Sequence, residues 1–114
     1  MSYERGEVVW GPDPFKSTEA PRPWLICNND DHPFGDEEYV TVTLTTTPHD
    51  ETVPITDEDW VDGGMPRQSY ASPWSVASPK HAALVRRQGR LRESFVQRVV
   101  AELESYLAPP PTVA

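Results

Sequence analysis

The sequence predicts a single mainly β domain, a small barrel of about five to seven strands followed by one amphipathic C-terminal helix. Thirteen prolines lie among the 114 residues. Each proline fixes φ and removes a backbone donor, so long helices are excluded before residue 80. Between residues 40 and 45, valine or leucine alternates strictly with threonine, and after residue 90 apolar side chains recur at helical spacing. Short strands followed by one helix favour a coiled sheet or barrel that packs against that helix.

Turn-forming residues separate the expected strands. Residues 11–14 and 28–31 are turn clusters that close the first two strands. In the central strand, Val40, Val42 and Leu44 are expected on a buried face, with the alternating threonines exposed on the other face. Gly63-Gly64 is expected to turn the chain, and Pro73 is expected to interrupt the segment that follows. The expected strands cover residues 7–10, 23–27, 40–45, 52–55, 68–71 and 74–77.

The pattern changes from strand to helix near residue 78. Ser78-Pro79 is a helix-start signal, and we expect a short helical turn after it that Gly89 ends. The apolar stripe of the final helix consists of residues four positions apart, namely Leu91, Phe95, Val99, Leu103 and Leu107. Three prolines at residues 109–111 end this helix. We therefore expect one domain at residues 1–108 and a disordered tail at residues 109–114.

The composition argues against several functional classes. The longest apolar runs, such as residues 24–27, are far shorter than the roughly 18 residues that span a bilayer. The first residues include no apolar leader, so a cytoplasmic location is expected. The single cysteine, Cys27, excludes an internal disulfide and the usual thiolate zinc sites, and its apolar neighbours indicate a buried small hydrophobe.

The charge distribution is uneven. The net charge of −8 argues against binding nucleic acid by global charge. Eleven acids and no Lys or Arg lie between Asp30 and Asp62, whereas six of the ten basic residues lie between Lys80 and Arg98. Such a surface could attract anions at one end, although a solvated basic face explains the same residues.

Several segments, taken in order, match a known pattern. They are residues 5–10 (Arg-Gly-Glu-Val-Val-Trp), residues 21–28 with their Pro-Arg-Pro opening, residues 40–46, the segment that begins at Ser69, and Gly89-Arg90-Leu91 before the final helix. Over residues 4–107, their order and spacing resemble the MazF/PemK family of toxins. The resemblance implies an SH3-like, CcdB/MazF-like barrel and usually a homodimer. It also implies cleavage of single-stranded RNA without metal or cofactor, and control by a cognate antitoxin.

Residue-by-residue comparison with that family carries over two positions, Arg22 and Thr45. In such cleavage the ribose 2′-OH attacks its own phosphate, which requires a base, an acid for the leaving oxygen and cationic donors for the developing charge. Arg22 lies between two prolines that fix its backbone. The alternatives are a loop arginine paired with a carboxylate such as Glu19, and for Thr45 simple β-propensity. His49 is the best-placed candidate base by pKa type, although an exposed loop histidine fits equally.

Further residues are predicted to contact RNA. The resemblance places Ser17 in the first loop, where some members carry a histidine, and places Ser69 after the long loop. Tryptophans can stack on unpaired bases, and Trp60, in an acidic loop, is a more plausible surface contact than Trp10 and Trp24, which are expected in the core. The full RNA-binding set is Ser17, Thr46, Trp60, Arg67 and Ser69. The three histidines show no metal-binding spacing.

Two functions therefore remain open from the sequence. The first is an endoribonuclease toxin with single-stranded RNA and an antitoxin as partners. The second is a non-catalytic binding module on the same barrel, either a degenerate toxin or a protein-targeting growth inhibitor. The Arg22 and Thr45 positions favour the enzyme, whereas the absence of an obvious general base favours the binding module.

Overall fold

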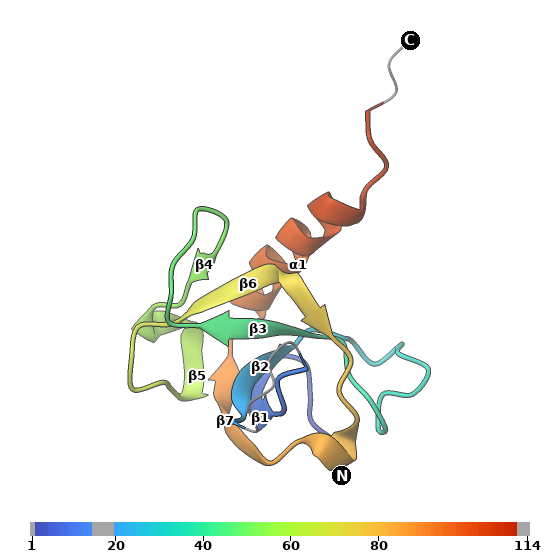
Figure 1. Cartoon of the computed structure of the whole chain (residues 1–114), viewed down its shortest axis with the longest axis vertical. Coiled ribbons are helices and arrows are strands. Elements are labelled where there is room, and N and C mark those ends of the chain that lie inside the picture. Colours follow the sequence, from blue (N-terminus) through green and yellow to red (C-terminus); the bar gives the residue numbers. More distant parts are fainter. Residues whose placement is uncertain (1, 15–19, 112–114) are drawn as a thin grey trace.

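The computed structural model of the chain describes residues 2–14 and 20–111, and these form one antiparallel sheet with a C-terminal helix (Figure 1). The sheet has seven strands and the helix, α1, is Glu93–Leu107. Short 3₁₀ turns occur at Asp57–Asp59 (η1) and His81–Ala83 (η2). The strands are β1 (Glu7–Gly11), β2 (Arg22–Ile26), β3 (Thr41–Thr45), β4 (Val53–Pro54), β5 (Trp60–Gly63), β6 (Tyr70–Ala77) and β7 (Arg86–Leu91).

The order of the strands explains why the sheet is curled. In space the order is β4-β6-β3-β2-β1-β7-β5, so β4 and β5 are the two edge strands. In sequence, however, only residues 55–59 connect them. A connection this short holds the opposite edges near each other, and the sheet must coil toward a barrel. The expected mainly β barrel with one terminal helix is therefore confirmed.

The curled sheet has buried side chains on both faces. Phe95, Val96 and Val99 of α1 pack with Val8 and Leu44 in one cluster. The second cluster, on the other face, contains Val9, Trp24, Ile26 and Tyr39. Phe95 and Val99 of the predicted stripe therefore face the sheet. Leu91 belongs to β7 and not to the helix, and Leu107 is exposed, so the stripe was wrong at both ends.

One expected exposed face is in fact buried. Thr41 and Thr43 of β3 are 0% and 2% exposed, so the prediction that the alternating threonines face solvent was wrong for these two. In the register of β2 and β3, Thr43 lies opposite Trp24 and Thr41 lies opposite Ile26. The threonines therefore share the face of the second cluster, and the Thr41 hydroxyl donates a hydrogen bond to the Ala77 carbonyl at 2.9 Å. The alternation of apolar residues with threonine predicted strand β3 correctly. It could not predict that the curled sheet also buries the threonine face of this strand.

Three local predictions also require correction. Strand β6 continues through Pro73, because a shift in register against β3 between Val42 and Thr43 accommodates the missing donor. Residues 60–63 form strand β5 rather than an acidic loop. Gly89 lies within strand β7 and does not end a helical turn. A Cβ atom at Gly89 would lie 2.6 Å from the Asp62 carbonyl oxygen, so this glycine permits the close approach of β5 and β7.

The basic cluster at residues 80–98 is largely neutralised by acids. Arg87 pairs with Glu7 and with Asp62, and these two carboxylates, Asp62 first, raise the pKa of its guanidinium. Each of three other pairs joins a basic residue of this cluster to an acid far away in sequence, namely Lys80–Glu38, Arg90–Glu4 and Arg92–Asp59. The basic cluster therefore does not form a continuous phosphate-binding stripe. Cys27 is buried as expected, and burial raises the pKa of its thiol to about 12, which leaves it unreactive at neutral pH.

No helix in the described part of the chain is long and apolar enough to cross a membrane.

Asp59 anchors the connection between the two edge strands to the start of α1. Its carboxylate accepts hydrogen bonds from the Thr56 amide at 2.8 Å, the Thr56 hydroxyl at 3.0 Å and the Arg92 Nε at 3.1 Å. Its carbonyl accepts a bond from the Arg92 amide at 2.8 Å. Burial opposes the charged form of Asp59, but the bonds from Thr56 and Arg92 outweigh it, so its pKa lies below the ordinary value.

Replacing Asp59 with asparagine tests this anchor. We expect the free energy of unfolding near pH 7 to fall by about 1–3 kcal/mol, because the charge-assisted bonds are lost inside the fold. The pKa of Asp59 is lower in the folded state than in the unfolded state. Its contribution to the free energy of unfolding is therefore fully present above the unfolded-state pKa of about 4, and it is lost as pH falls through the folded-state pKa. In Asp59→Asn this part of the pH dependence should be absent. Urea unfolding at several pH values measures both effects.

The exposed neighbour Asp57 provides the control, since it belongs to the same 3₁₀ turn. Asp57→Asn is expected to leave stability and its slope with pH almost unchanged. Equal effects of the two substitutions would contradict the role of Asp59.

Candidate functional site

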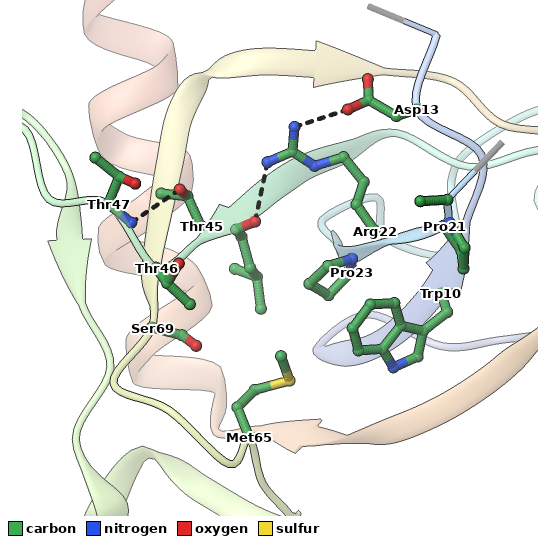
Figure 2. A pocket seen from close by; sticks show the side chains of 12 residues that line it. Trp10, Asp13, Pro21, Arg22, Pro23, Thr45, Thr46, Thr47, Met65 and Ser69 are labelled. Atoms are coloured by element: carbon green, nitrogen blue, oxygen red, sulfur yellow. Dashed lines mark hydrogen bonds and ion pairs between the residues drawn. The ribbon is translucent and has the colours of Figure 1, made fainter. Parts of the chain in front are cut away.

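A surface cavity of about 340 Å³ lies where β2 begins and β3 ends. We call it the Arg22 pocket (Figure 2). Aromatic, proline and methionine side chains form part of its wall, and hydroxyl side chains form another part. Its lining residues include Trp10, Asp13, Arg22, Thr45, Thr46, Thr47, Met65 and Ser69.

Strand pairing brings Arg22 and Thr45 together. In the antiparallel register Trp24 lies opposite Thr43. Arg22 precedes Trp24 by two positions and Thr45 follows Thr43 by two, so the same register carries them to the same end of the strand pair. Side chains two positions apart share a face of a strand. Residues distant in sequence thus line one pocket, as the sequence-based hypothesis required.

Two fixed acceptors hold the Arg22 guanidinium. One terminal nitrogen donates to Asp13 Oδ2 at 3.0 Å and the other donates to the Leu44 carbonyl at 3.1 Å (Figure 2). The Asp13 side chain is 4% exposed and that of Arg22 is 24% exposed. Arg22 Nε is buried and has no hydrogen-bond partner among the described residues. The guanidinium therefore has little rotational freedom but still reaches the pocket, which suits a preorganised anion donor.

The alternative interpretation of Arg22 was a loop arginine paired with a carboxylate such as Glu19. Glu19 lies outside the described residues, and the carboxylate that pairs with Arg22 is Asp13. A nearly buried pair of this kind is unlike a solvated surface ion pair, because both groups have given up much of their hydration.

The loop that follows β3 orients the Thr45 hydroxyl. Thr45 is half-buried, and its Oγ1 accepts a hydrogen bond from the Thr47 amide at 3.1 Å (Figure 2). Accepting this bond leaves the hydroxyl proton to be donated elsewhere. Thr46 and Ser69, both predicted to contact RNA, line the same pocket. Ser69 is buried, and its hydroxyl donates to the Arg67 carbonyl at 3.0 Å.

The structure does not place His49 with Arg22 and Thr45. His49 is exposed in the loop after β3, and its ring meets the Trp74 ring edge-on, with centroids 6.1 Å apart. It lines another cavity with Glu51, Trp74 and Tyr106. The pKa type of histidine and the position of His49 just after the central strand suggested it as a base, but it does not line the Arg22 pocket. None of the described residues lining the Arg22 pocket is a histidine.

Two further RNA-binding predictions, Trp60 and Arg67, concern residues that lie beside the pocket. Trp60 and Arg67 line a smaller cavity of about 180 Å³, which shares Met65 and Ser69 with the Arg22 pocket. Trp60 is half-buried and packs against the core. It is therefore less exposed than the predicted position in an acidic surface loop implied. Ser17 lies outside the described residues.

Trp10 and Asp13 are two of the lining residues that the sequence did not predict as part of a site. Trp10 was assigned to the core, yet it is half-buried, lines the pocket and donates through Nε1 to Gln88 Oε1 at 2.8 Å. The Arg86 guanidinium stacks on this ring, 4.7 Å from its centroid. Asp13 was read only as part of a turn cluster. A lone acid between two prolines, close in sequence to the Pro-Arg-Pro segment, was the available signal.

The chemistry of the pocket is that of an arginine–aspartate ion pair beside neutral hydroxyls. Arg22 and Asp13 are the charged side chains among the described lining residues, and Thr45, Thr46, Thr47 and Ser69 supply hydroxyls. Over residues 2–14 and 20–111, no group of three or more His, Cys, Asp or Glu side chains is arranged to hold a metal ion. Such a set can bind an anionic group and donate hydrogen bonds to it.

Comparison with solved structures shows which proteins share this fold. An endoribonuclease from a Mycobacterial species, in complex with its cognate antitoxin, superposes with a TM-score of 0.71 at 21% identity, covering 96% of this chain and 98% of that chain. The Mycobacterium tuberculosis toxin MazF-mt6 gives a TM-score of 0.68 at 17% identity, covering 89% and 95%. A chain of the MazE–MazF structure from Deinococcus radiodurans gives 0.70 at 14% identity, covering 94% and 96%.

These likenesses confirm the MazF-like fold expected from the sequence. They extend over nearly the whole of this chain and of each matched chain. No protein-family model matches the sequence, and no curated protein matches it either.

A double-mutant cycle tests the pairing of Asp13 with Arg22. Arg22→Ala removes a cation that pairs with the nearly buried Asp13 carboxylate, and Asp13→Ala removes an anion that pairs with the guanidinium. We expect each substitution to lower the free energy of unfolding by about 1–3 kcal/mol. The double substitution should cost at least about 1 kcal/mol less than the sum. Urea unfolding provides the measurement, and additive losses would show that the two side chains are energetically independent.

Proposed function

We propose that this chain is the toxin of a type II toxin–antitoxin system and acts as an endoribonuclease on single-stranded RNA. The observation that carries the proposal is the convergence of the Arg22 guanidinium and the Thr45 hydroxyl on one open pocket. The pocket belongs to a barrel with the fold of endoribonuclease toxins. Convergence was the geometric condition that the sequence-based hypothesis had to meet.

The proposed reaction is an internal transfer of the phosphoryl group. The ribose 2′-hydroxyl loses its proton to water and its oxygen attacks the adjacent phosphorus. The O2′–P bond forms, the P–O5′ bond breaks, and the leaving O5′ takes up a proton from water. The products are a 2′,3′-cyclic phosphate and a 5′-hydroxyl end. Negative charge grows on the non-bridging oxygens in the transition state, and Arg22 faces the pocket as the cation that stabilises it. The Thr45 hydroxyl donates a further hydrogen bond to the phosphate or the leaving oxygen.

In this proposal, Asp13 positions Arg22. Asp13 Oδ2 already accepts a hydrogen bond from the guanidinium, so a role in alignment suits it better than a role as general base. Its bond to one terminal nitrogen and the Leu44 bond to the other set the plane of the guanidinium before substrate arrives. Fixed donors cost no reorganisation at the moment of reaction, which is why such alignment increases rate.

Single-stranded RNA is the substrate that best suits the rim of the pocket. Trp10 and the Arg86 side chain stacked on it form a flat platform beside the Arg22 pocket. Unpaired bases stack on aromatic rings and on guanidinium planes, whereas paired bases are not available to do so. With a net charge of −8, binding must depend on these local contacts rather than on the overall field.

The proposal includes partners and a location. A structural neighbour was solved with its cognate antitoxin and another in a MazE–MazF structure. By analogy, we infer that an antitoxin protein binds this chain and that the chain acts as a homodimer in the cytoplasm.

A second candidate function is a non-catalytic binding module on the same barrel. The observation that favours it is the lack of a histidine among the described lining residues, together with the ion pairing of the carboxylate that is present. A module of this kind would bind RNA or a protein at the pocket without breaking a bond.

Expression of wild type beside Arg22→Ala distinguishes the two functions. We expect wild type to cut a defined single-stranded RNA and Arg22→Ala to be at least about 100-fold slower, because one charge-stabilising donor is lost from the transition state. Thr45→Val should be slower by about tenfold, the loss of roughly one hydrogen bond. Cleavage is followed on a labelled oligonucleotide by gel, with growth measured in parallel.

Two controls make the result specific. Arg98 is exposed on α1 and does not line the pocket, so Arg98→Ala should cut at the wild-type rate. A substrate with a 2′-O-methyl group at the cleaved nucleotide should be resistant, because its 2′-oxygen has no proton to lose. Growth arrest by wild type and Arg22→Ala alike, with RNA left intact, would favour the binding module.

A further inference from the structure

A second open cavity lies away from the Arg22 pocket and shares no lining residue with it. Its volume is about 450 Å³, and it is lined by His49, Glu51, Trp74 and Tyr106. These residues come from the loop after β3, from β6 and from the last turn of α1. Figure 1 shows this end of α1 extending beyond the sheet.

The aromatic side chains here are unusually exposed. Trp74 is 46% exposed and Tyr106 is 44% exposed, and the next residue, Leu107, is 73% exposed. The His49 ring meets the Trp74 ring edge-on, so these two rings form adjacent walls of the cavity at an angle to each other. An aromatic hollow left open to solvent costs free energy in a small domain, so a binding role is the natural explanation.

The charges around the hollow are negative. Glu51 lines it, and Glu102 lies one helical turn before Tyr106, on the same side of α1. Partial burial, then the charges of Glu102 and Glu51, raise the pKa of the Tyr106 phenol. None of the described lining residues is Lys or Arg. Arg98, the arginine within α1, instead stacks on Phe95 at 5.8 Å from its centroid.

This combination of aromatic rings and carboxylates discriminates between ligands. An RNA base could stack on Trp74, but its phosphates would approach Glu51 and Glu102 without a described cation to offset them. A lysine or arginine side chain instead meets aromatic faces that attract cations and carboxylates that pair with them. Charge complementarity therefore selects a cationic group over a nucleic acid.

We propose that the cavity lined by His49, Glu51, Trp74 and Tyr106 binds an arginine side chain presented by a basic segment of a partner protein. Arginine is favoured over lysine because its planar guanidinium can stack on Trp74 while its edge pairs with a carboxylate. The site is separate from the proposed catalytic pocket, so the two can be occupied at the same time. The inference does not depend on ribonuclease activity.

Binding is measured with a short acetylated and amidated peptide that contains two arginines, and with a matched peptide that contains citrulline, which is neutral. The indole N–H signal of Trp74 is assigned in an NMR spectrum by its loss in Trp74→Phe. We expect the arginine peptide to shift this signal with a dissociation constant of roughly 0.1–1 mM. The citrulline peptide should bind at least about fivefold more weakly.

Substitutions then test the two parts of the site. Trp74→Ala should weaken peptide binding by at least about tenfold and Glu51→Gln by about three- to fivefold. Matched controls are Phe34→Ala, an aromatic residue that is 54% exposed and lies outside this cavity, and Glu58→Gln, an exposed acid on η1. Both controls should bind as wild type does. Thermal unfolding verifies that every variant is folded, and RNA cleavage by Trp74→Ala should equal that of wild type.

Three outcomes would overturn the proposal. Equal binding of the arginine and citrulline peptides would remove the role of charge. A shift of the Trp74 signal by a single-stranded RNA oligonucleotide, but not by the peptide, would assign the cavity to nucleic acid. Self-association that disappears in Trp74→Ala, with no peptide binding, would show that a second copy of this chain covers it.

Discussion

The rest of the structure depends on one constraint, the short connection between the two edge strands. Strands β4 and β5 lie at opposite ends of the sheet order, yet only residues 55–59 join them. The buried carboxylate of Asp59 accepts hydrogen bonds from Thr56, within this connection, and from Arg92, at the start of α1. These bonds hold the connection against the helix. Because the edges are held near each other, the sheet curls, and side chains on both of its faces become buried.

Pairing between neighbouring strands builds the candidate site. Pairing of β2 with β3 brings Arg22 and Thr45 to one end of the strand pair, and the turn after β1 supplies Asp13 from the other side. Asp13 and the Leu44 carbonyl then hold the guanidinium in one orientation. A guanidinium that the fold holds in one orientation beside hydroxyl side chains is a preorganised donor to an anionic group. The pocket is therefore a product of the sheet rather than of one loop.

An acidic protein can bind RNA only where its negative surface is locally interrupted. Most arginines of β7 and of the start of α1 form ion pairs with carboxylates. Arg87, which pairs with Glu7 and Asp62, is an example. Arg22 remains directed to a pocket, and Arg86 remains stacked on Trp10 at its rim. The cavity beside Trp74 and Tyr106 has the opposite character, since its charges are carboxylates. The two surfaces thus suit ligands of opposite charge.

The sequence by itself determined the class of fold and the final helix, because strand alternation, proline content and a four-residue repeat are local signals. It also identified Arg22 and Thr45 as a pair to test. Only the tertiary structure decided that Thr41 and Thr43 are buried, that β6 passes through Pro73, and that residues 60–63 and 86–91 are strands. It also separated His49 from the pocket and placed Asp13 within it. The physical reason is that burial and proximity follow from strand pairing between distant segments, which a local pattern does not encode.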